Sequence, residues 1–235
     1  METLILTTDS ISNLPFILQL SMLRRGWPLF FLHFSIGNSS DLNQIKVLFD
    51  KYLEHSTKTN SPQFYNQLFS GFSTTGYIGE LLATITNNSM YTYEMSPVAT
   101  LMEIELLNKM SGLVGYKNGG GTFVPGGSSG NFLAMLAARH FRMPEVMSSG
   151  LFGVSPMTVF VSRDCHYSMV KSANQLGIGM SNIIKVDVDK DGRMIPDALD
   201  QAIQVSLNNG AIPFFVGATG GTTVRGSFDP IQEVA

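Results

Sequence analysis

Two short segments of the chain carry residue types that could bind a ligand and act on it. The first is the apolar run Phe160–Ser162, which ends in polar residues and leads to His166. This pattern is typical of a buried strand that delivers a side chain to a cleft. The second is the glycine-rich segment Pro125–Asn131, and a glycine turn that opens a helix presents N–H groups and a helix dipole to a phosphate. Together the two segments predict a site for a phosphorylated cofactor with an aromatic ring.

Strands and helices are expected to alternate around the histidine. The expected strands cover residues 158–162, 182–188 and 213–218, and the helices between them cover residues 168–176 and 196–207. Strict alternation implies crossover connections and a mainly parallel sheet flanked by helices, which is an α/β fold. Ligands bind such sheets outside the carboxyl ends of the strands. His166 and the run Thr219–Thr223 are both expected at this edge.

The residues before the glycine turn are expected to be helices and loops. Apolar residues recur at helical spacing from Leu42 to Leu53. The segment Phe64–Gly71 is expected to be a loop with aromatic anchors. Ser96 followed by Pro97 predicts a helix start, with a cap and then a first-turn proline, for a helix that reaches about Met110. Another helix is expected over residues 131–141.

Composition limits the class of protein. The net charge of −3 gives no electrostatic reason to expect nucleic acid as a partner. The apolar share is 44% against a charged share of 14%, which makes subunit contacts a plausible use for surplus apolar surface. Cys165 is the one cysteine, so the chain has no internal disulfide and suits a reducing compartment. We expect a cytoplasmic protein without a membrane partner.

The first 40 residues differ from the rest by being unusually apolar. Their uncharged stretches, Ser10–Leu23 and Gly26–Ser40, are too short for a spanning helix, which needs about 20 apolar residues. A secretory signal would begin with basic residues, whereas this segment carries Glu2 and Asp9. Two interpretations remain open for residues 1–40: a packing or dimer-contact segment, or a start site displaced into unrelated sequence.

Five segments in register resemble one enzyme family from about Leu42 to Ala235. The family is the group II pyridoxal-phosphate-dependent decarboxylases, especially the branch that acts on glutamate and cysteine sulfinate. The segments are FYNQLFSG (64–71), YTYEMSPV (91–98), FVPGGSSGN (123–131), CHYS (165–168) and TGGTTVRGSFDP (219–230). No comparable resemblance covers residues 1–40. The resemblance implies the type I fold of pyridoxal enzymes, a large αβα domain that is active as a homodimer. It divides the chain into a helical and loop segment, 41–95, and an incomplete cofactor-binding large domain, 96–235.

The resemblance also implies roles for single residues in binding pyridoxal 5'-phosphate. Gly127 and Ser128 match positions that hold the cofactor phosphate, and the alternative is a helix cap that needs a glycine bend. His166 matches the catalytic histidine that stacks on the cofactor ring and assists proton transfer, and the alternative is a hydrogen-bonded structural histidine. Thr223 matches a threonine close to the ring. Its neighbour is Thr222, and the alternative for Thr223 is a β-turn threonine that bonds backbone groups.

Substrate contacts are implied by the first of the five segments. Asn66 and Gln67 match residues that contact the substrate's side-chain acid group, and a neutral amide can donate to a carboxylate or sulfinate. Both are also common as plain loop residues. Cys165 has no paired base and is expected to be a partly buried spectator. No metal site is expected.

Some family features are changed or missing. Gly130 stands where this branch usually has serine, and Gly220 where it has alanine or serine. The family's strand with the aspartate that pairs with the ring nitrogen is expected just past Ala235, and the Schiff-base lysine is expected further on. Lys171 is expected to be a solvated helix lysine rather than a substitute for it.

These features predict an amino-terminal part of an enzyme that decarboxylates an amino acid. The expected substrate is acidic (glutamate, aspartate or cysteine sulfinate), and the products are carbon dioxide and an amine. One alternative is a truncated, non-catalytic subunit or a fragment of this family. Another is a different type I pyridoxal enzyme, such as an aminotransferase or a relative of sphingosine-phosphate lyase.

Overall fold

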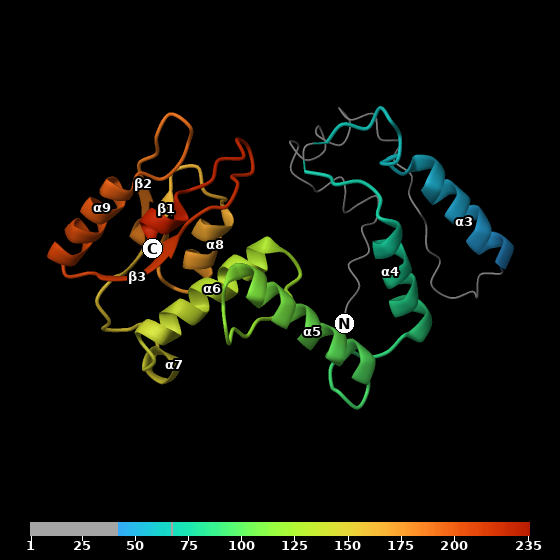
Figure 1. Cartoon of the computed structure of the whole chain (residues 1–235), viewed down its shortest axis with the longest axis horizontal. Helices are drawn as coiled ribbons and strands as arrows, with labels where there is room; N and C mark the ends of the chain where they lie inside the picture. Colours follow the sequence, from blue (N-terminus) through green and yellow to red (C-terminus); the bar gives the residue numbers. More distant parts are fainter. Residues whose placement is uncertain (1–41, 67) are drawn as a thin grey trace, which may run out of the picture. The chain divides into compact units, whose positions relative to one another are not determined.

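A computed structural model describes residues 42–66 and 68–235 of the chain (Figure 1). The apolar segment 1–40 and the substrate-contact candidate Gln67 lie outside the described residues. The chain divides into two units, Met1–Phe64 and Tyr65–Ala235. The division into a helical and loop segment, 41–95, and a cofactor-binding domain, 96–235, stays a prediction.

The first unit contributes helix α3 (Leu42–His55). Its apolar residues recur at helical spacing, so the predicted helix is confirmed, and Lys46 pairs with Asp50 one turn later at 3.4 Å. The helix has no buried residue, and Leu42 and Tyr52 are both mostly exposed.

The second unit contains a parallel sheet of three strands. The strands are β1 (Met157–Ser162), β2 (Ile183–Val186) and β3 (Ile212–Gly217), in the order β2-β1-β3. Val159 is opposite Ile183 on one side of β1 and Phe215 on the other. Helix α8 (Ser168–Gln175) and the short η1 (Met180–Asn182) connect β1 to β2, and α9 (Pro196–Asn208) connects β2 to β3. The predicted alternation and parallel sheet are confirmed.

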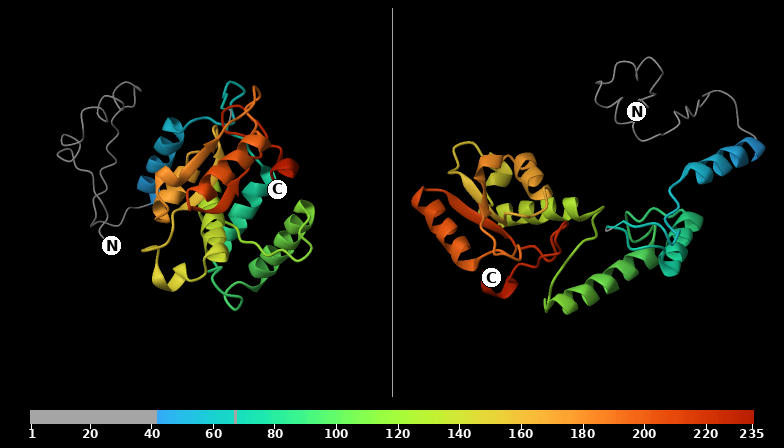
Figure 2. Two further views of the ribbon diagram at one scale, coloured as in Figure 1. Left: turned by 90° about the vertical axis from the view of Figure 1, so that its left-hand side faces the viewer. Right: turned by 90° about the horizontal axis from the view of Figure 1, so that it is seen from above.

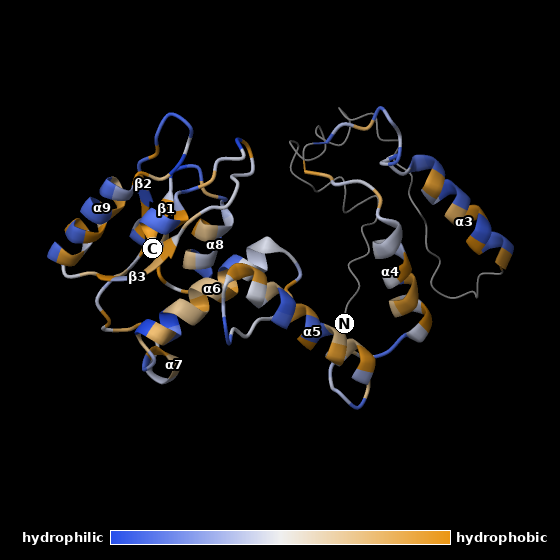
Figure 3. Cartoon of the chain, in the orientation of Figure 1, coloured by the Kyte–Doolittle hydropathy of each residue, from blue (hydrophilic) through white to orange (hydrophobic). Residues whose placement is uncertain are grey.

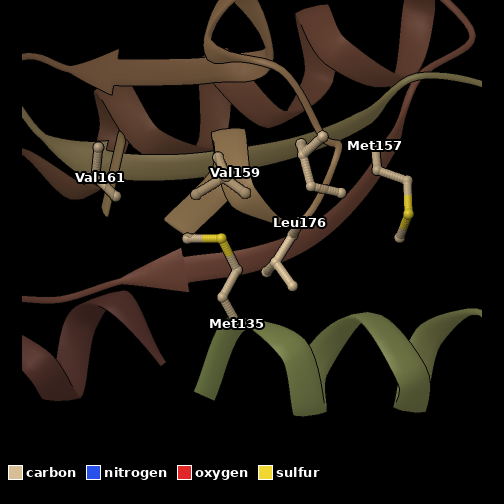
Figure 4. Packing of buried hydrophobic residues seen from close by; sticks show 7 residues of the cluster. Met135, Met157, Val159, Val161 and Leu176 are labelled. Carbon is tan, nitrogen blue, oxygen red and sulfur yellow. The ribbon is translucent and has the colours of Figure 1, made fainter. Parts of the chain in front are cut away.

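Helices cover both faces of this sheet, as Figure 2 shows. Successive residues of β1 point to opposite faces, so Val159 and Val161 pack with α6 (Gly127–Arg142) and α8, while Phe160 packs with α9. Figure 4 shows Met135 of α6 pointing at the sheet near Val159 and Leu176. Every residue of β1 is buried, which explains why the consecutive residues Val159–Val161 are all apolar.

Only one of the remaining helices that the structure describes begins at a side-chain cap. Helix α4 (Thr74–Thr86) begins where Ser73 Oγ accepts the N–H of Gly76 at 3.2 Å. Helix α5 (Pro97–Val114) begins at the predicted proline, but the hydroxyl of Ser96 makes no capping hydrogen bond, so this part of the prediction was wrong. The remaining helices are the short α7 (Val146–Ser149) and α10 (Ile231–Val234).

Helices α4 and α5 leave much apolar surface uncovered. Neither has a buried residue in the structure, although both carry many apolar side chains (Figure 3). Leu101, Leu113 and Val114 of α5 are 55%, 77% and 73% exposed. Apolar surface of this extent is typical of a contact with another chain or domain. None of the described helices is long and apolar enough to cross a membrane.

Candidate functional site

The glycine turn opens helix α6, and its first residues border open space. Gly126 has a φ of 132°, a conformation that side chains rarely adopt, and no atom lies within 4 Å of a Cβ placed on Gly126 or Gly127. The amides of Ser129 and Gly130 bond back to the carbonyl of Gly126 at 3.1 and 3.2 Å. Gly127 and Ser128 are exposed, and their N–H groups lie in the first turn, before the first amide that bonds within the helix, so they can donate to an anion.

Two hydrogen bonds connect the helix of this turn to His166. Asn131 Nδ2 of α6 donates to Ser168 Oγ of α8 at 2.8 Å. Ser168 Oγ lies 2.8 Å from His166 Nδ1, and the backbone N–H of Ser168 also donates to that nitrogen at 3.2 Å. The glycine turn and His166 therefore lie at neighbouring helix starts, on the carboxyl edge of the sheet.

The imidazole of His166 is half-buried and has aromatic and cationic neighbours. Its ring centroid lies 4.2 Å from that of Tyr167, at an interplanar angle of 37°. Lys171 Nζ lies 5.0 Å from the centroid of the Tyr167 ring. This cation–π contact gives Lys171 a structural role in α8, in agreement with its expected place on a helix surface.

A pocket of about 440 Å³ lies where helices α6 and α8 meet. Its lining combines four serines, one lysine, one glutamine and one phenylalanine: Ser128, Ser129, Phe132, Ser168, Lys171, Ser172 and Gln175. Hydroxyl and amide groups beside a single cation suit an anionic group, and the first turn of α6 contributes Ser128 and Ser129 to the lining. The residues present therefore fit a phosphate held at the glycine turn.

The two threonines of the loop after β3 differ in burial and in hydrogen bonding. Thr222 is buried, and its Oγ1 accepts the backbone N–H of Ser227 at 3.1 Å, so it is the turn threonine. Thr223 is exposed, which leaves its hydroxyl accessible to a ligand. Arg225 connects this loop to the segment before His166 through Asp164, with 3.3 Å between the charged atoms.

Asp229 holds the base of the same loop. Its buried carboxylate accepts the backbone N–H groups of Met194 and Thr219, each at 2.7 Å. The first bond holds Met194, in the segment between β2 and α9. The second holds Thr219, the second residue after the end of β3. One carboxylate thus fixes two loops on the carboxyl side of the sheet.

Asn66 makes hydrogen bonds within its own turn. Its side-chain oxygen accepts the N–H of Leu68 at 3.0 Å, and its carbonyl accepts that of Phe69 at 3.2 Å. The side-chain oxygen of Asn66 therefore serves the turn, as expected for a plain loop residue. Its N–H₂ group can still donate to a ligand. The structure gives no contact between Asn66 and His166, so its substrate role stays a prediction.

Cys165 precedes the histidine, and its thiol is not activated as a nucleophile. Burial raises the pKa of its thiol, and the nearby Lys185 only partly opposes this effect. A thiol kept protonated is a poor nucleophile. Within the described ranges, no group of three or more metal-ligating side chains is close enough to hold an ion.

The two glycines that differ from the family pattern lie where a small side chain would fit. A Cβ on Gly220 would lie 3.9 Å from the Phe228 ring, and one on Gly130 would lie 3.4 Å from Val124. Neither glycine has a positive φ. The departures therefore change little at the site.

Sequence reasoning missed the contacts that hold the site together. Asn131 and Ser168 were recognised only as parts of matching segments, and their hydrogen bond joins positions 37 residues apart. Asp229 was likewise only one letter of a segment. A serine two residues after a strand-end histidine is the one local signal that could have suggested a side-chain partner for His166.

Comparisons with known proteins agree on one family. A family model described as the pyridoxal-dependent decarboxylase conserved domain matches residues 33–235. The acidic amino acid decarboxylase GADL1 of Bos taurus is 45% identical over 183 residues, which are 78% of this chain and 35% of that protein. The human cysteine sulfinic acid decarboxylase is 43% identical over 183 residues, 78% of this chain and 37% of that protein.

A solved structure extends the likeness to the fold. The crystal structure of mouse CSAD superposes with a TM-score of 0.83 and 39% sequence identity, covering 93% of this chain and 44% of that chain. This likeness confirms the predicted fold class. The chain spans little more than a third of the length of the curated relatives that it matches.

Proposed function

This chain belongs to the pyridoxal-dependent decarboxylase family, and we propose that it builds the cofactor site of an enzyme that removes the α-carboxylate of an acidic amino acid. The proposed substrates are glutamate, aspartate or cysteine sulfinate, and the products are carbon dioxide and an amine. The relatives named for acidic amino acids and for cysteine sulfinic acid support this substrate class. Because the chain spans only part of their length, the activity is proposed for the full-length protein.

The observation that carries the proposal is the pair of hydrogen bonds from Asn131 through Ser168 to His166. They bring a phosphate-type helix start and a half-buried imidazole to one edge of the sheet. Pyridoxal 5'-phosphate has a phosphate and an aromatic ring, and so fits both features. When bound, it supplies a ring that takes up the electron pair left at Cα as carbon dioxide departs.

The chain's own residues would bind and orient the ligand. The amides of Gly127 and Ser128 would donate to the phosphate, because the helix dipole favours its negative charge. His166 would hold the plane of the ring and exclude water from one face, and the exposed Thr223 could donate its hydroxyl. Asn66 and Gln67 would donate amide hydrogens to the side-chain acid group of the substrate.

The decisive experiment measures carbon dioxide released by the full-length protein from carboxyl-labelled amino acids with added cofactor. We expect release from at least one acidic amino acid and much less from aromatic ones. Gln67→Ala should raise the KM for the acidic substrate by on the order of 10-fold or more, because a hydrogen bond to a charged group is lost. Asn88→Ala, an exposed loop change, is the control. Transfer of the amino group without carbon dioxide would refute decarboxylation.

We further propose that the protein is a homodimer that uses the apolar surface of α4 and α5. The exposure of Leu101, Leu113 and Val114 supports a contact that excludes water. Light scattering after gel filtration should give twice the chain mass for the full-length protein. Leu113→Glu should lower that mass, and a monomeric mass for the unchanged protein would contradict the proposal.

The proposed location is the cytoplasm, which the single cysteine supports because no disulfide is needed. Fractionation of the source cells with an antibody against the chain tests this. Recovery in an organelle fraction would contradict it.

A further inference from the structure

We propose that Asn131 and Ser168 are positioning residues that hold His166 in the tautomer with its hydrogen on Nε2. The hydrogen bonds themselves require no cofactor, and only their catalytic use rests on the proposed function. Asn131 lies on α6, and Ser168 begins α8 two residues after the histidine. The three side chains form a continuous line of donors and acceptors.

The backbone N–H of Ser168 determines the state of Nδ1. This group can only donate, and it lies 3.2 Å from His166 Nδ1. A hydrogen on Nδ1 would face another hydrogen, so Nδ1 must offer its lone pair. In a neutral imidazole the ring hydrogen is then on Nε2.

Asn131 determines the direction of the serine hydroxyl. Its Nδ2 donates to Ser168 Oγ at 2.8 Å, so the serine oxygen accepts from the amide. The serine hydrogen is then available for His166 Nδ1, also 2.8 Å away. Both donors of Ser168 therefore act on the same ring nitrogen, and the amide of Asn131 is what orients the second one.

This arrangement couples the two ends of the proposed cofactor site. Asn131 lies one helical turn after Gly127, whose amide is at the phosphate end of α6. The same helix therefore presents the phosphate-binding amides and orients the ring-stacking histidine. His166 Nε2 takes part in no hydrogen bond within the part of the chain that the structure describes, so its hydrogen is left to donate to a ligand atom.

Nuclear magnetic resonance of the full chain, labelled with nitrogen-15 in the histidine rings, tests this directly. Two-bond and three-bond couplings from ring carbon-bound hydrogens distinguish the two tautomers, and loss of signals in His166→Gln assigns the residue. We expect the Nε2–H pattern for His166 without any cofactor. An Nδ1–H pattern in the unchanged chain would overturn the proposal.

The sharpest variant is Asn131→Asp, which keeps size but reverses the direction of the relay. An aspartate oxygen accepts the serine hydrogen, so Ser168 Oγ turns a lone pair toward Nδ1. We expect the ratio of the Nε2–H to the Nδ1–H form to fall on the order of 10-fold, the effect of about one hydrogen bond. Ser168→Ala, which keeps the backbone donor, should lower the ratio less.

Ser172→Ala is the matched control. Ser172 is buried on the same helix one turn after Ser168, and it also lines the pocket. It should leave the tautomer ratio unchanged. If Asn131→Asp does not fold, as judged by circular dichroism, Asn131→Ala replaces it, and an unchanged ratio in that variant and in Ser168→Ala refutes the positioning role. Because the measurement needs no turnover, its failure is distinguishable from failure of the proposed decarboxylation.

Discussion

Replacement of the buried Asp229 by asparagine tests whether one carboxylate holds the two loops on the carboxyl side of the sheet. The carboxylate is 4% exposed and accepts two backbone N–H groups at 2.7 Å. In Asp229→Asn the side-chain oxygen can keep one of these bonds, but the new N–H₂ group faces the other amide. The shape is preserved, so the change isolates the hydrogen bonds.

The magnitude follows from those two contacts. One charge-assisted bond is lost and leaves a buried N–H without an acceptor, and the other becomes a neutral bond. Loss of a hydrogen bond to a charged group costs about 1.5–3 kcal/mol, so we expect the free energy of unfolding to fall by at least this amount. The amides of Met194 and Thr219 should also exchange faster, because both lose or weaken their acceptor.

Urea unfolding followed by circular dichroism, with amide hydrogen exchange read by mass spectrometry, measures both effects. Asp200→Asn is the control, because Asp200 is exposed on α9. The control should change the unfolding free energy by less than about 0.5 kcal/mol. Equal stability of both variants, with both amides still protected in Asp229→Asn, would refute the role assigned to this carboxylate.

Three further predictions concern the core, an acidic turn and the cysteine. Met135→Ala should lower the free energy of unfolding by about 2–5 kcal/mol, because Met135 is completely buried, whereas Met180→Ala, at a 60% exposed position, should have little effect. Hydrogen bonds from the N–H of Arg193 and Asp191 hold the pKa of Asp189 below its ordinary value of 3.8. The stabilisation of this turn is therefore present above that value and is lost as pH falls through the lowered pKa. The protection of the turn's amides, measured against their intrinsic exchange rates at each pH, should fall only in strong acid. A loss of protection already at neutral pH would contradict this. Burial raises the pKa of Cys165 above its ordinary value of 9.0, so its reaction with a disulfide reagent at neutral pH should be slower than that of free cysteine; an equally fast reaction would show that the thiol is activated.

The elements that sequence predicted well are those whose pattern reports burial. The middle of β1, residues 158–161, is β-branched and aromatic because both faces of the strand are covered, and its observed start differs from the expected one by one residue. α9 begins at Pro196 as expected, because a proline fits the first turn of a helix. In these segments the local pattern and the tertiary environment require the same structure.

The elements that sequence predicted poorly depend on weak local preferences. α4 contains Gly76, Gly79 and several threonines, which are poor helix formers, and its start depends on the hydroxyl of Ser73. α6 begins at Gly127, four residues before the expected start, because the glycine and serine residues there were interpreted as a turn. The carbonyl of Gly126 accepts the first helical bonds, and this could not be read from composition.

The site itself was predicted as a set of residues but not as an arrangement. His166 and the glycine turn were identified from motifs. That they lie close together follows from the parallel sheet, because both are at its carboxyl edge. The hydrogen bonds of Asn131 and Asp229 link residues that are distant in sequence. Asn131 and Ser168 are 37 positions apart, and Asp229 and Met194 are 35 positions apart. Such contacts depend on the exact packing of α6, α8 and the loops, which no local pattern encodes.

A crystal structure of the full-length protein with pyridoxal 5'-phosphate would show whether the start of α6 and His166 bind two parts of one cofactor. We expect the phosphate oxygens within hydrogen-bond distance of the Gly127 and Ser128 amides, and the pyridine ring parallel to the imidazole of His166. A phosphate bound away from the α6 start, or a ring that does not contact His166, would contradict this expectation.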